Sequence, residues 1–143
     1  MIRLEDVNEK NWRIPFAVTD AQKQYVASST MLLARAYAYR NARSQAYIIY
    51  NDGTPIGMGL YHDEPKFNAY IFSEFFINAQ HQGKGYGEEA TRMVLDAMKA
   101  DGKYSKVILC YIQGNKAAKH LYEKFGFVET GRDEDEIIME LNF

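Results

Sequence analysis

The chain has 143 residues, of which 47% are hydrophobic and 25% are charged, and its formal net charge is −2. This is the composition of a globular protein, and the slightly negative charge argues against a nucleic-acid-binding protein that works through one basic face. Cys110 is the only cysteine and the three histidines lack metal-ligand spacing, so we expect neither an internal disulfide nor a zinc site.

The N-terminal part of the chain is predicted to form a strand followed by a broken helical region. Met1–Val7 alternates apolar and polar residues, which is the pattern of a half-buried strand. Residues 11–43 are predicted to be mostly helical, with breaks near Pro15 and at Thr19–Asp20, where either side chain can cap a helix.

Three strands are predicted next. Gln45–Tyr50 and Pro55–His62 are apolar runs joined by a turn that contains Asp52-Gly53, a strong signal for a β-hairpin. Ala69–Asn78 is a third long strand candidate. These segments predict an antiparallel meander.

The C-terminal half alternates between helix and strand. Gly85–Ala100 has apolar residues on one stripe and is predicted to be a helix packed on a sheet, and Tyr104–Ile112 is rich in β-forming residues. Asn115–Phe125 is predicted to be a helix that Gly126 ends, and Ile137–Leu141 is a final strand. The order indicates a mixed α/β fold.

No repeat or linker divides the chain. No apolar run approaches the roughly 18 residues of a membrane span, and no signal-peptide pattern is present. We therefore expect a cytoplasmic protein that works without a membrane.

A glycine-rich turn, Gln82–Gly87, follows a predicted strand and opens a predicted helix. Glycines let successive backbone N–H groups point at one spot, and a helix N-terminus adds positive potential, so such a turn suits a pyrophosphate. A Walker P-loop would end in Gly-Lys-Ser/Thr, which is missing here. A dinucleotide fingerprint through Gly85-x-Gly87-x-x-Ala90 conflicts with the preceding antiparallel meander. The remaining structural alternative is a tight turn that binds nothing.

The turn resembles the acetyl-CoA pyrophosphate loop of the GNAT superfamily of acetyltransferases. Gln82, Gly85 and Gly87 fill its pattern, Gln/Arg-x-x-Gly-x-Gly/Ala. The stretch Asn115–Phe127 is similar to a second GNAT signature, Asn-x-x-Ala-x-x-Leu-Tyr-x-x-x-Gly-Phe, at every fixed position. The two motifs in this order are specific, and the resemblance covers roughly Ser73–Gly131.

This resemblance implies the GNAT fold, an α/β architecture in which helices flank a central, mixed, mostly antiparallel twisted sheet, with Met1–Phe143 as a single domain. It also implies an acetyl-CoA-dependent N-acetyltransferase that takes acetyl-CoA as co-substrate and needs no metal. The strand before the turn is expected to splay from its neighbour and to pair with the pantetheine arm. The residues carried over as cofactor-binding are Phe75, Phe76, Ile77, Gln82, Gly83, Lys84, Gly85, Tyr86, Gly87 and Asn115.

Two residues are carried over as catalytic. The resemblance puts Tyr122 beside the CoA sulfur, where a phenol with an ordinary pKa of about 10 can protonate the departing thiolate. The structural alternative is a packed tyrosine. Related enzymes often have an acid where this chain has Ser73, whereas the acid here is Glu74, which strand alternation puts on the opposite face. Glu74 is therefore open between a base or amine anchor and a solvent-facing strand residue.

The arrangement is most similar to bacterial spermidine/spermine (diamine) N-acetyltransferases, which share the stretch Phe75–Gly85 and a helical Tyr-Val/Ile pair like Tyr25-Val26. Asp63-Glu64 and Asp133–Glu136 are expected to attract a polycation, with solvated loops as the alternative. The expected substrates are acetyl-CoA and a polyamine such as spermidine. Another small amine, an antibiotic or a protein N-terminus as acceptor, a non-catalytic acyl-CoA sensor, and a homodimer all stay open.

Overall fold

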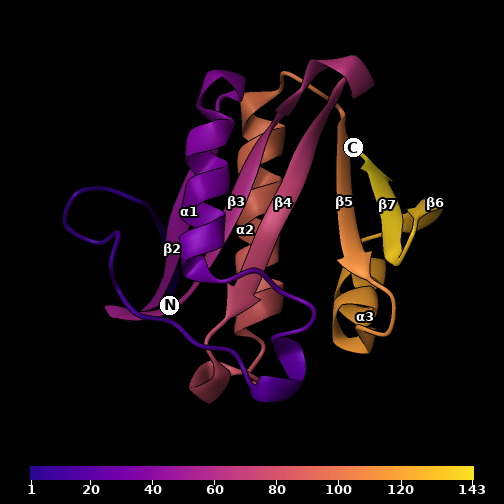
Figure 1. Cartoon of the computed structure of the whole chain (residues 1–143). Coiled ribbons are helices and arrows are strands. Elements are labelled where there is room, and N and C mark those ends of the chain that lie inside the picture. The colour runs from indigo at the N-terminus through magenta and orange to yellow at the C-terminus, as the bar shows by residue number, and fades with distance from the viewer.

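The computed structural model describes residues 1–143 and contains one seven-stranded sheet in the order β1-β2-β3-β4-β5-β7-β6 (Figure 1). All neighbouring strands pair antiparallel except β4 and β5, which are parallel, so the predicted mixed, mostly antiparallel sheet is confirmed. The strands are β1 (Ile2–Asp6), β2 (Gln45–Asn51), β3 (Thr54–Glu64), β4 (Ala69–Ile77), β5 (Lys106–Ile112), β6 (Val128–Asp133) and β7 (Glu136–Asn142). The helices are α1 (Ser29–Ala38), α2 (Tyr86–Asp101) and α3 (Lys116–Lys124).

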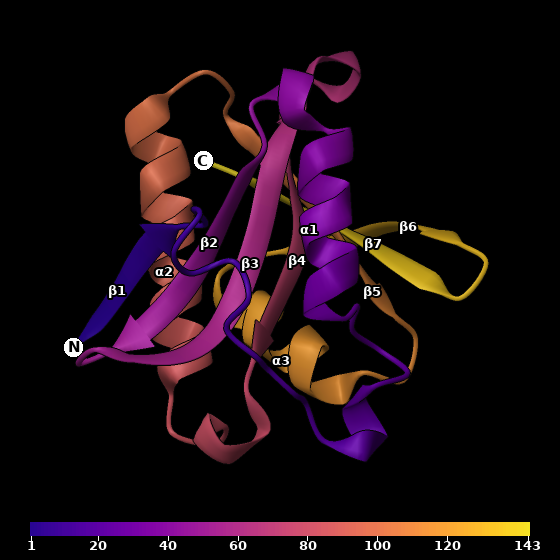
Figure 2. The same ribbon diagram turned by 60° about the vertical axis from the view of Figure 1, so that its left-hand side comes forward.

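The sheet has a core on each face. Helix α1 covers one face, and α2 and α3 lie on the other (Figures 1 and 2). Strand alternation divides the side chains between them: Ile48 packs with Leu32 of α1, whereas Ile49 packs with Val94 of α2. None of the helices combines the length and the apolar character that crossing a membrane requires.

The helical prediction for residues 11–43 is wrong in its first half. Only α1 is a full helix, and the chain before it contains turns, an irregular stretch at residues 14–19 and a 3-10 turn at Asp20–Gln22. The backbone N–H of Ala17 donates to Asn78 Oδ1 at 2.7 Å, and the Ala79 N–H donates to the Ala17 carbonyl at 2.8 Å. These tertiary hydrogen bonds engage the backbone beside the end of β4, and they override local helix propensity.

Strand β6 was not expected from the sequence. Val128–Asp133 is mostly exposed and forms one edge of the sheet, so it lacks the alternation that marks a half-buried strand. It exists because it pairs with β7 as a hairpin, with Glu134 in the left-handed region of the turn.

The parallel pairing between β4 and β5 is short. Tyr70–Phe72 pairs with Val107–Leu109, and no residue of β4 after Phe72 has a partner on β5. The two strands separate toward α3, as Figure 1 shows. The predicted splay of this strand is therefore present, and it leaves one side of Ser73–Ile77 unpaired.

Candidate active site

A cavity of about 330 Å³ lies where β4 and β5 separate. Its walls come from β4, the glycine turn, the start of α2 and α3, with Tyr25 and Val26 of the N-terminal segment. Of the predicted site residues, only Lys84 does not line it; that side chain is exposed. The predicted residues that do are Glu74, Phe75, Phe76, Ile77, Gln82, Gly83, Gly85, Tyr86, Gly87, Asn115 and Tyr122.

The glycine turn owes its shape to backbone conformation. Gly83 has φ 76° and Gly85 has φ 82°, in the left-handed region, and a Cβ at either residue would meet no atom within 4 Å. Glycine is therefore required here for its backbone freedom and leaves open space beside the turn. Gly85 is the N-cap of α2, so the positive end of the helix dipole adjoins the cavity. An anion would be stabilised at this end.

Three of the predicted cofactor residues also have structural roles. The Gln82 amide donates to the Ile77 carbonyl at 2.7 Å and to Gln22 Oε1 at 2.8 Å, which ties the turn to β4 and to the N-terminal segment. The Tyr86 hydroxyl accepts from Asn51 Nδ2 at 3.1 Å, and Asn115 Oδ1 caps α3 by accepting from the Ala118 N–H at 3.2 Å. These bonds hold the cavity wall in shape.

Tyr122 reaches the cavity from α3. Its side chain is buried, and its ring meets those of Phe72 and Phe127 edge to face, with centroids 6.2 Å and 5.7 Å apart. Burial, reinforced by the charge of Glu74, raises the pKa of the phenol well above its ordinary value. The hydroxyl is therefore protonated at neutral pH, which is the state from which a general acid must start.

A β-bulge at Ser73 corrects the predicted orientation of Glu74. Leu60 pairs with Glu74 and Tyr61 with Phe72, so Ser73 has no partner on β3. The extra residue interrupts the alternation of side chains, because two residues of β4 here oppose one. Ser73 and Glu74 are consequently both bonded by one side chain of α1, and the expectation that they lie on opposite faces is wrong.

That side chain is Arg35. Its Nη1 donates to Glu74 Oε1 at 2.5 Å and to Ser73 Oγ at 3.2 Å. Burial raises the pKa of the Glu74 carboxyl; Arg35 opposes this shift, and the nearby Glu136 adds to it. A carboxylate whose pKa lies above its ordinary range is a better proton acceptor, so Glu74 is suited to receive a proton or to hold a cation.

A second cavity, of about 690 Å³, adjoins the first. The two share residues of β4 and β5, and Glu74 lies on both walls. The second cavity is also lined by Glu64 and Glu136, neither of which forms an ion pair, and by the stacked rings of Tyr39 and His62, whose centroids are 4.1 Å apart. This cavity is acidic and partly aromatic, and it opens from the side of the sheet that carries α1.

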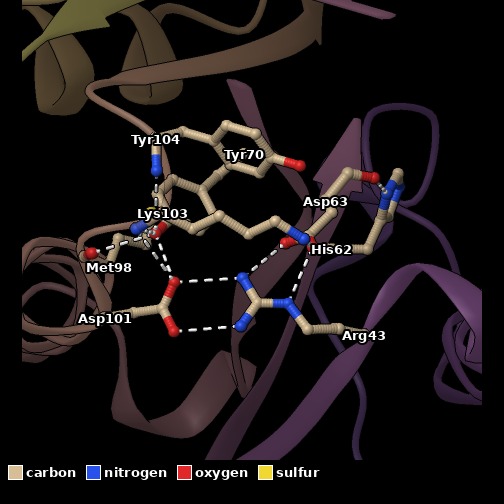
Figure 3. A network of polar contacts seen from close by, with 8 residues as sticks. All are labelled: Arg43, His62, Asp63, Tyr70, Met98, Asp101, Lys103 and Tyr104. Carbon is tan, nitrogen blue, oxygen red and sulfur yellow. Dashed lines mark hydrogen bonds and ion pairs between the residues drawn. The ribbon is translucent and has the colours of Figure 1, made fainter. Parts of the chain in front are cut away.

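Only some of the acidic residues predicted to attract a polycation line a cavity. Glu64 and Glu136 line the second cavity, but Asp63 is buried and receives hydrogen bonds from Arg43, at 2.7 Å and 3.0 Å, and from Lys103 Nζ at 3.0 Å (Figure 3). The expectation that Asp63 faces a ligand is therefore wrong. Asp133 lies in the β6–β7 hairpin and lines neither cavity.

The N-terminal segment contributes more than predicted. Tyr25 and Val26 line both cavities but lie in a turn, so the predicted helix around them is wrong. The Tyr25 hydroxyl lies next to Gly114, where an added Cβ would be 3.2 Å from it. Tyr25 therefore spans from the α1 side to the loop between β5 and α3. A role for Arg35 could not be predicted from the sequence, because a single arginine in an amphipathic helix usually faces solvent.

Comparisons with known proteins agree with this geometry. The sequence pattern described as the acetyltransferase (GNAT) family matches residues 4–127. A spermine/spermidine N(1)-acetyltransferase of Bacillus subtilis is 26% identical over 120 residues, which cover 80% of this chain and 78% of that protein.

Two solved structures share the fold. The spermidine N-acetyltransferase from Vibrio cholerae in complex with CoA and spermine superimposes with a TM-score of 0.77 at 20% identity, covering 99% of this chain and 95% of that one. An acetyltransferase from Salmonella typhimurium that modifies the N-terminal serine of ribosomal protein L7/L12 gives a TM-score of 0.74 at 12% identity, covering 99% and 95%.

Proposed function

This chain belongs to the acetyltransferase (GNAT) family of acetyl-CoA-dependent N-acetyltransferases, and on that premise we propose that its acceptor is a polyamine such as spermidine or spermine. The observation that carries the proposal is the meeting of two cavities at Glu74. One cavity begins at a glycine turn suited to a pyrophosphate, and the other is lined by carboxylates suited to a cationic chain.

The first cavity is assigned to acetyl-CoA. The pyrophosphate binds at Gln82–Gly87, where glycine conformation and the start of α2 favour an anion. The pantetheine arm runs along Phe75–Ile77, whose backbone has no strand partner on the β5 side. A backbone N–H there, at Phe76 or a neighbour, polarises the thioester carbonyl. Gly87 lies beside this path: a Cβ there would be in van der Waals contact, at 3.7 Å, with the side chains of Phe75 and Ile77.

The chemistry is direct attack of the amine on the thioester. Glu74 anchors the ammonium and takes its proton, and the free amine forms a bond to the acetyl carbon. The C–S bond breaks as Tyr122 gives its proton to the leaving thiolate as a general acid. The second proton on the acceptor nitrogen restores the phenol of Tyr122, and Glu74 releases the first proton to solvent. Tyr122 and Glu74 line the same cavity, and the charge of Glu74 acts on the phenol.

The charge of the second cavity supports the proposed acceptor class. Glu64 and Glu136 have no cationic partner within the protein, and both line the cavity that Glu74 opens into. Carboxylates spaced along a cavity favour a ligand with several ammonium groups over one with a single charge. The names of the Bacillus and Vibrio relatives support the same class.

The test is a thiol-release assay with acetyl-CoA across polyamines, amino acids, aminoglycosides and peptides. We expect spermidine or spermine to have the highest kcat/KM. Glu64→Gln and Glu136→Gln should raise the KM for the polyamine, while Glu134→Gln, in the exposed hairpin turn, should leave it unchanged. A preference for a peptide N-terminus or an aminoglycoside would reject the polyamine. Tight CoA binding without turnover of any amine would indicate a sensor.

A further inference from the structure

The Arg35 guanidinium occupies the position beside Glu74 that the proposed function gives to the ammonium of the acceptor. Its Nη1 lies 2.5 Å from Glu74 Oε1, and no other cation pairs with that carboxylate. The Arg35 side chain is 41% exposed, whereas that of Glu74 is 13% exposed. The arginine can therefore move into solvent, while the carboxylate stays in the wall.

Arg35 differs in charge from every acidic residue around it. It is the only arginine or lysine that lines either cavity. Two of the other titratable residues lining the cavities are acidic, Glu136 of β7 and Glu64 of β3. The rest are the histidines, the cysteine and the tyrosines His62, His81, Cys110, Tyr25, Tyr39, Tyr86, Tyr111 and Tyr122. A fixed cation in a cavity lined by carboxylates weakens the binding of a cationic ligand, unless the ligand can displace that cation.

We propose that Arg35 is a positioning residue that exchanges with the substrate: it holds Glu74 until the ammonium of the acceptor displaces it, and it returns when the reaction has removed that charge. The inference rests on the proposed function, since it assumes that Glu74 is the amine anchor. The exchange gives Glu74 a cationic partner whenever it is ionised, and an unpaired buried charge would be costly.

The chemistry drives the return of Arg35. In the reaction, an ammonium and the thioester give an amide, a thiol and one proton: an N–C bond forms, the C–S bond breaks, and the charge on the acceptor nitrogen disappears. A neutral amide cannot compete with a guanidinium for a carboxylate, because its hydrogen bonds lack charge assistance. Once Glu74 has released to solvent the proton that it took from the ammonium, Arg35 re-forms its bond to the carboxylate and favours release of the product.

The experiment compares Arg35→Gln and Arg35→Lys with wild type. Arg40→Gln is the matched control, because Arg40 follows α1, donates to the Tyr37 carbonyl and lines neither cavity. Initial rates are measured at pH 8.5 or so, at saturating acetyl-CoA, with varied amine. We expect Arg35→Gln to lower the KM for the amine roughly two- to fivefold and to strengthen inhibition by the N-acetylated product, because the competing ion pair is gone. Arg35→Lys should stay near wild type, and Arg40→Gln should match it.

The pH profile is a second readout that a merely structural arginine would not move. Arg35 lowers the pKa of Glu74 against the effect of burial, so its removal should raise that pKa further. The carboxylate would then be lost at a higher pH, and the acid limb of kcat/KM should move upward in Arg35→Gln. In a Glu74→Gln background, the same substitution should change neither KM nor the profile.

An unchanged or higher KM in folded Arg35→Gln would overturn the proposal, because it would make Arg35 a packing or substrate-binding residue. If Arg35→Gln does not fold, Arg35→Met keeps the apolar stem and carries the same test. Failure of the proposed function looks different, since wild type itself would then acetylate no polyamine.

Discussion

At Tyr122, the burial that fixes the ring also keeps the hydroxyl protonated, as a general acid must be before it acts. Tyr122→Phe retains the ring contacts with Phe72 and Phe127, so the protein should fold with little loss of stability. We expect kcat to fall about 10²–10⁴-fold, the usual contribution of a positioned general acid. Single-turnover rates measure the chemical step, and titration with CoA measures binding, which should change far less.

The matched control is Tyr104→Phe, at another buried tyrosine on the same face of the sheet that lines neither cavity. A wild-type rate of acetyl transfer in Tyr122→Phe would assign Tyr122 to packing and leave the thiolate to depart unprotonated.

The orientation of Glu74 illustrates what a residue pattern leaves open. Alternation along β4 predicts opposite faces for Ser73 and Glu74, yet Arg35 bonds both. The bulge depends on how β3 and β4 pair across Leu60 and Tyr61, and that pairing is a tertiary property. The residue types of the site could be predicted, whereas the partner of Glu74 could not.

Among the elements, the glycine turn has the strictest requirement for residue type. Gly85→Val places a β-branched side chain at φ 82° and fills the open space beside the turn, so CoA affinity should fall more than about tenfold. Gly53→Val is the matched control: Gly53 has φ 88° and equally open surroundings, but it lies in the β2–β3 hairpin. Isothermal titration with CoA compares the two variants, and thermal unfolding checks that both are folded.

Equal loss of CoA affinity in both variants would mean that strain alone weakens binding. Unchanged affinity in folded Gly85→Val would remove the pyrophosphate from this turn.

Elements that bury a regular stripe were predictable, and those without one were not. Helix α2 and the β2–β3 hairpin match their predictions within a few residues, because apolar periodicity and an Asp-Gly turn carry the information locally. Strand β6 has no buried stripe, and the segment before α1 gains its backbone partners from Asn78 and Ala79. Both depend on neighbours distant in the chain.

Over the whole molecule, a polar network joins the two faces of the sheet (Figure 3). It includes Asp101 at the C-terminal end of α2, whereas the glycine turn adjoins the N-terminal end of that helix. Arg43 donates to Asp63 of β3 and, at 3.0 Å through Nη1 and Nη2, to Asp101 at the end of α2. The Tyr70 hydroxyl of β4 also donates to Asp101. Hydrogen bonds from Arg43 and then Tyr70 lower the pKa of Asp101, and those from Arg43 and Lys103 lower the pKa of Asp63 despite its burial.

These depressed pKa values determine how stability depends on pH. A carboxyl whose pKa is lower in the folded state contributes stability above its unfolded pKa and loses that contribution as the pH falls toward the folded value. Arg43→Gln should therefore lower the free energy of unfolding at pH 7 by about 1 kcal/mol, discounted because the arginine is 45% exposed. The difference from wild type should shrink below about pH 4. Urea unfolding at several pH values measures it.

Arg92→Gln, which breaks an exposed pair with Glu88 on α2, is the control and should change stability little at any pH. A deficit of Arg43→Gln that persists unchanged in acid would attribute it to lost packing.

The short parallel pairing between β4 and β5 has a consequence for the stability of the protein. Three residue pairs join β1–β4 to β5–β7, and acetyl-CoA at the proposed position would bridge the two parts where backbone pairing stops. Any ligand that binds only the folded state stabilises it by mass action, by about 2.7 kcal/mol at one hundred times its Kd. The free energy of unfolding of this protein would then rise and fall with the supply of acetyl-CoA, and starvation for the acetyl donor would lower the stability of the enzyme as well as its rate.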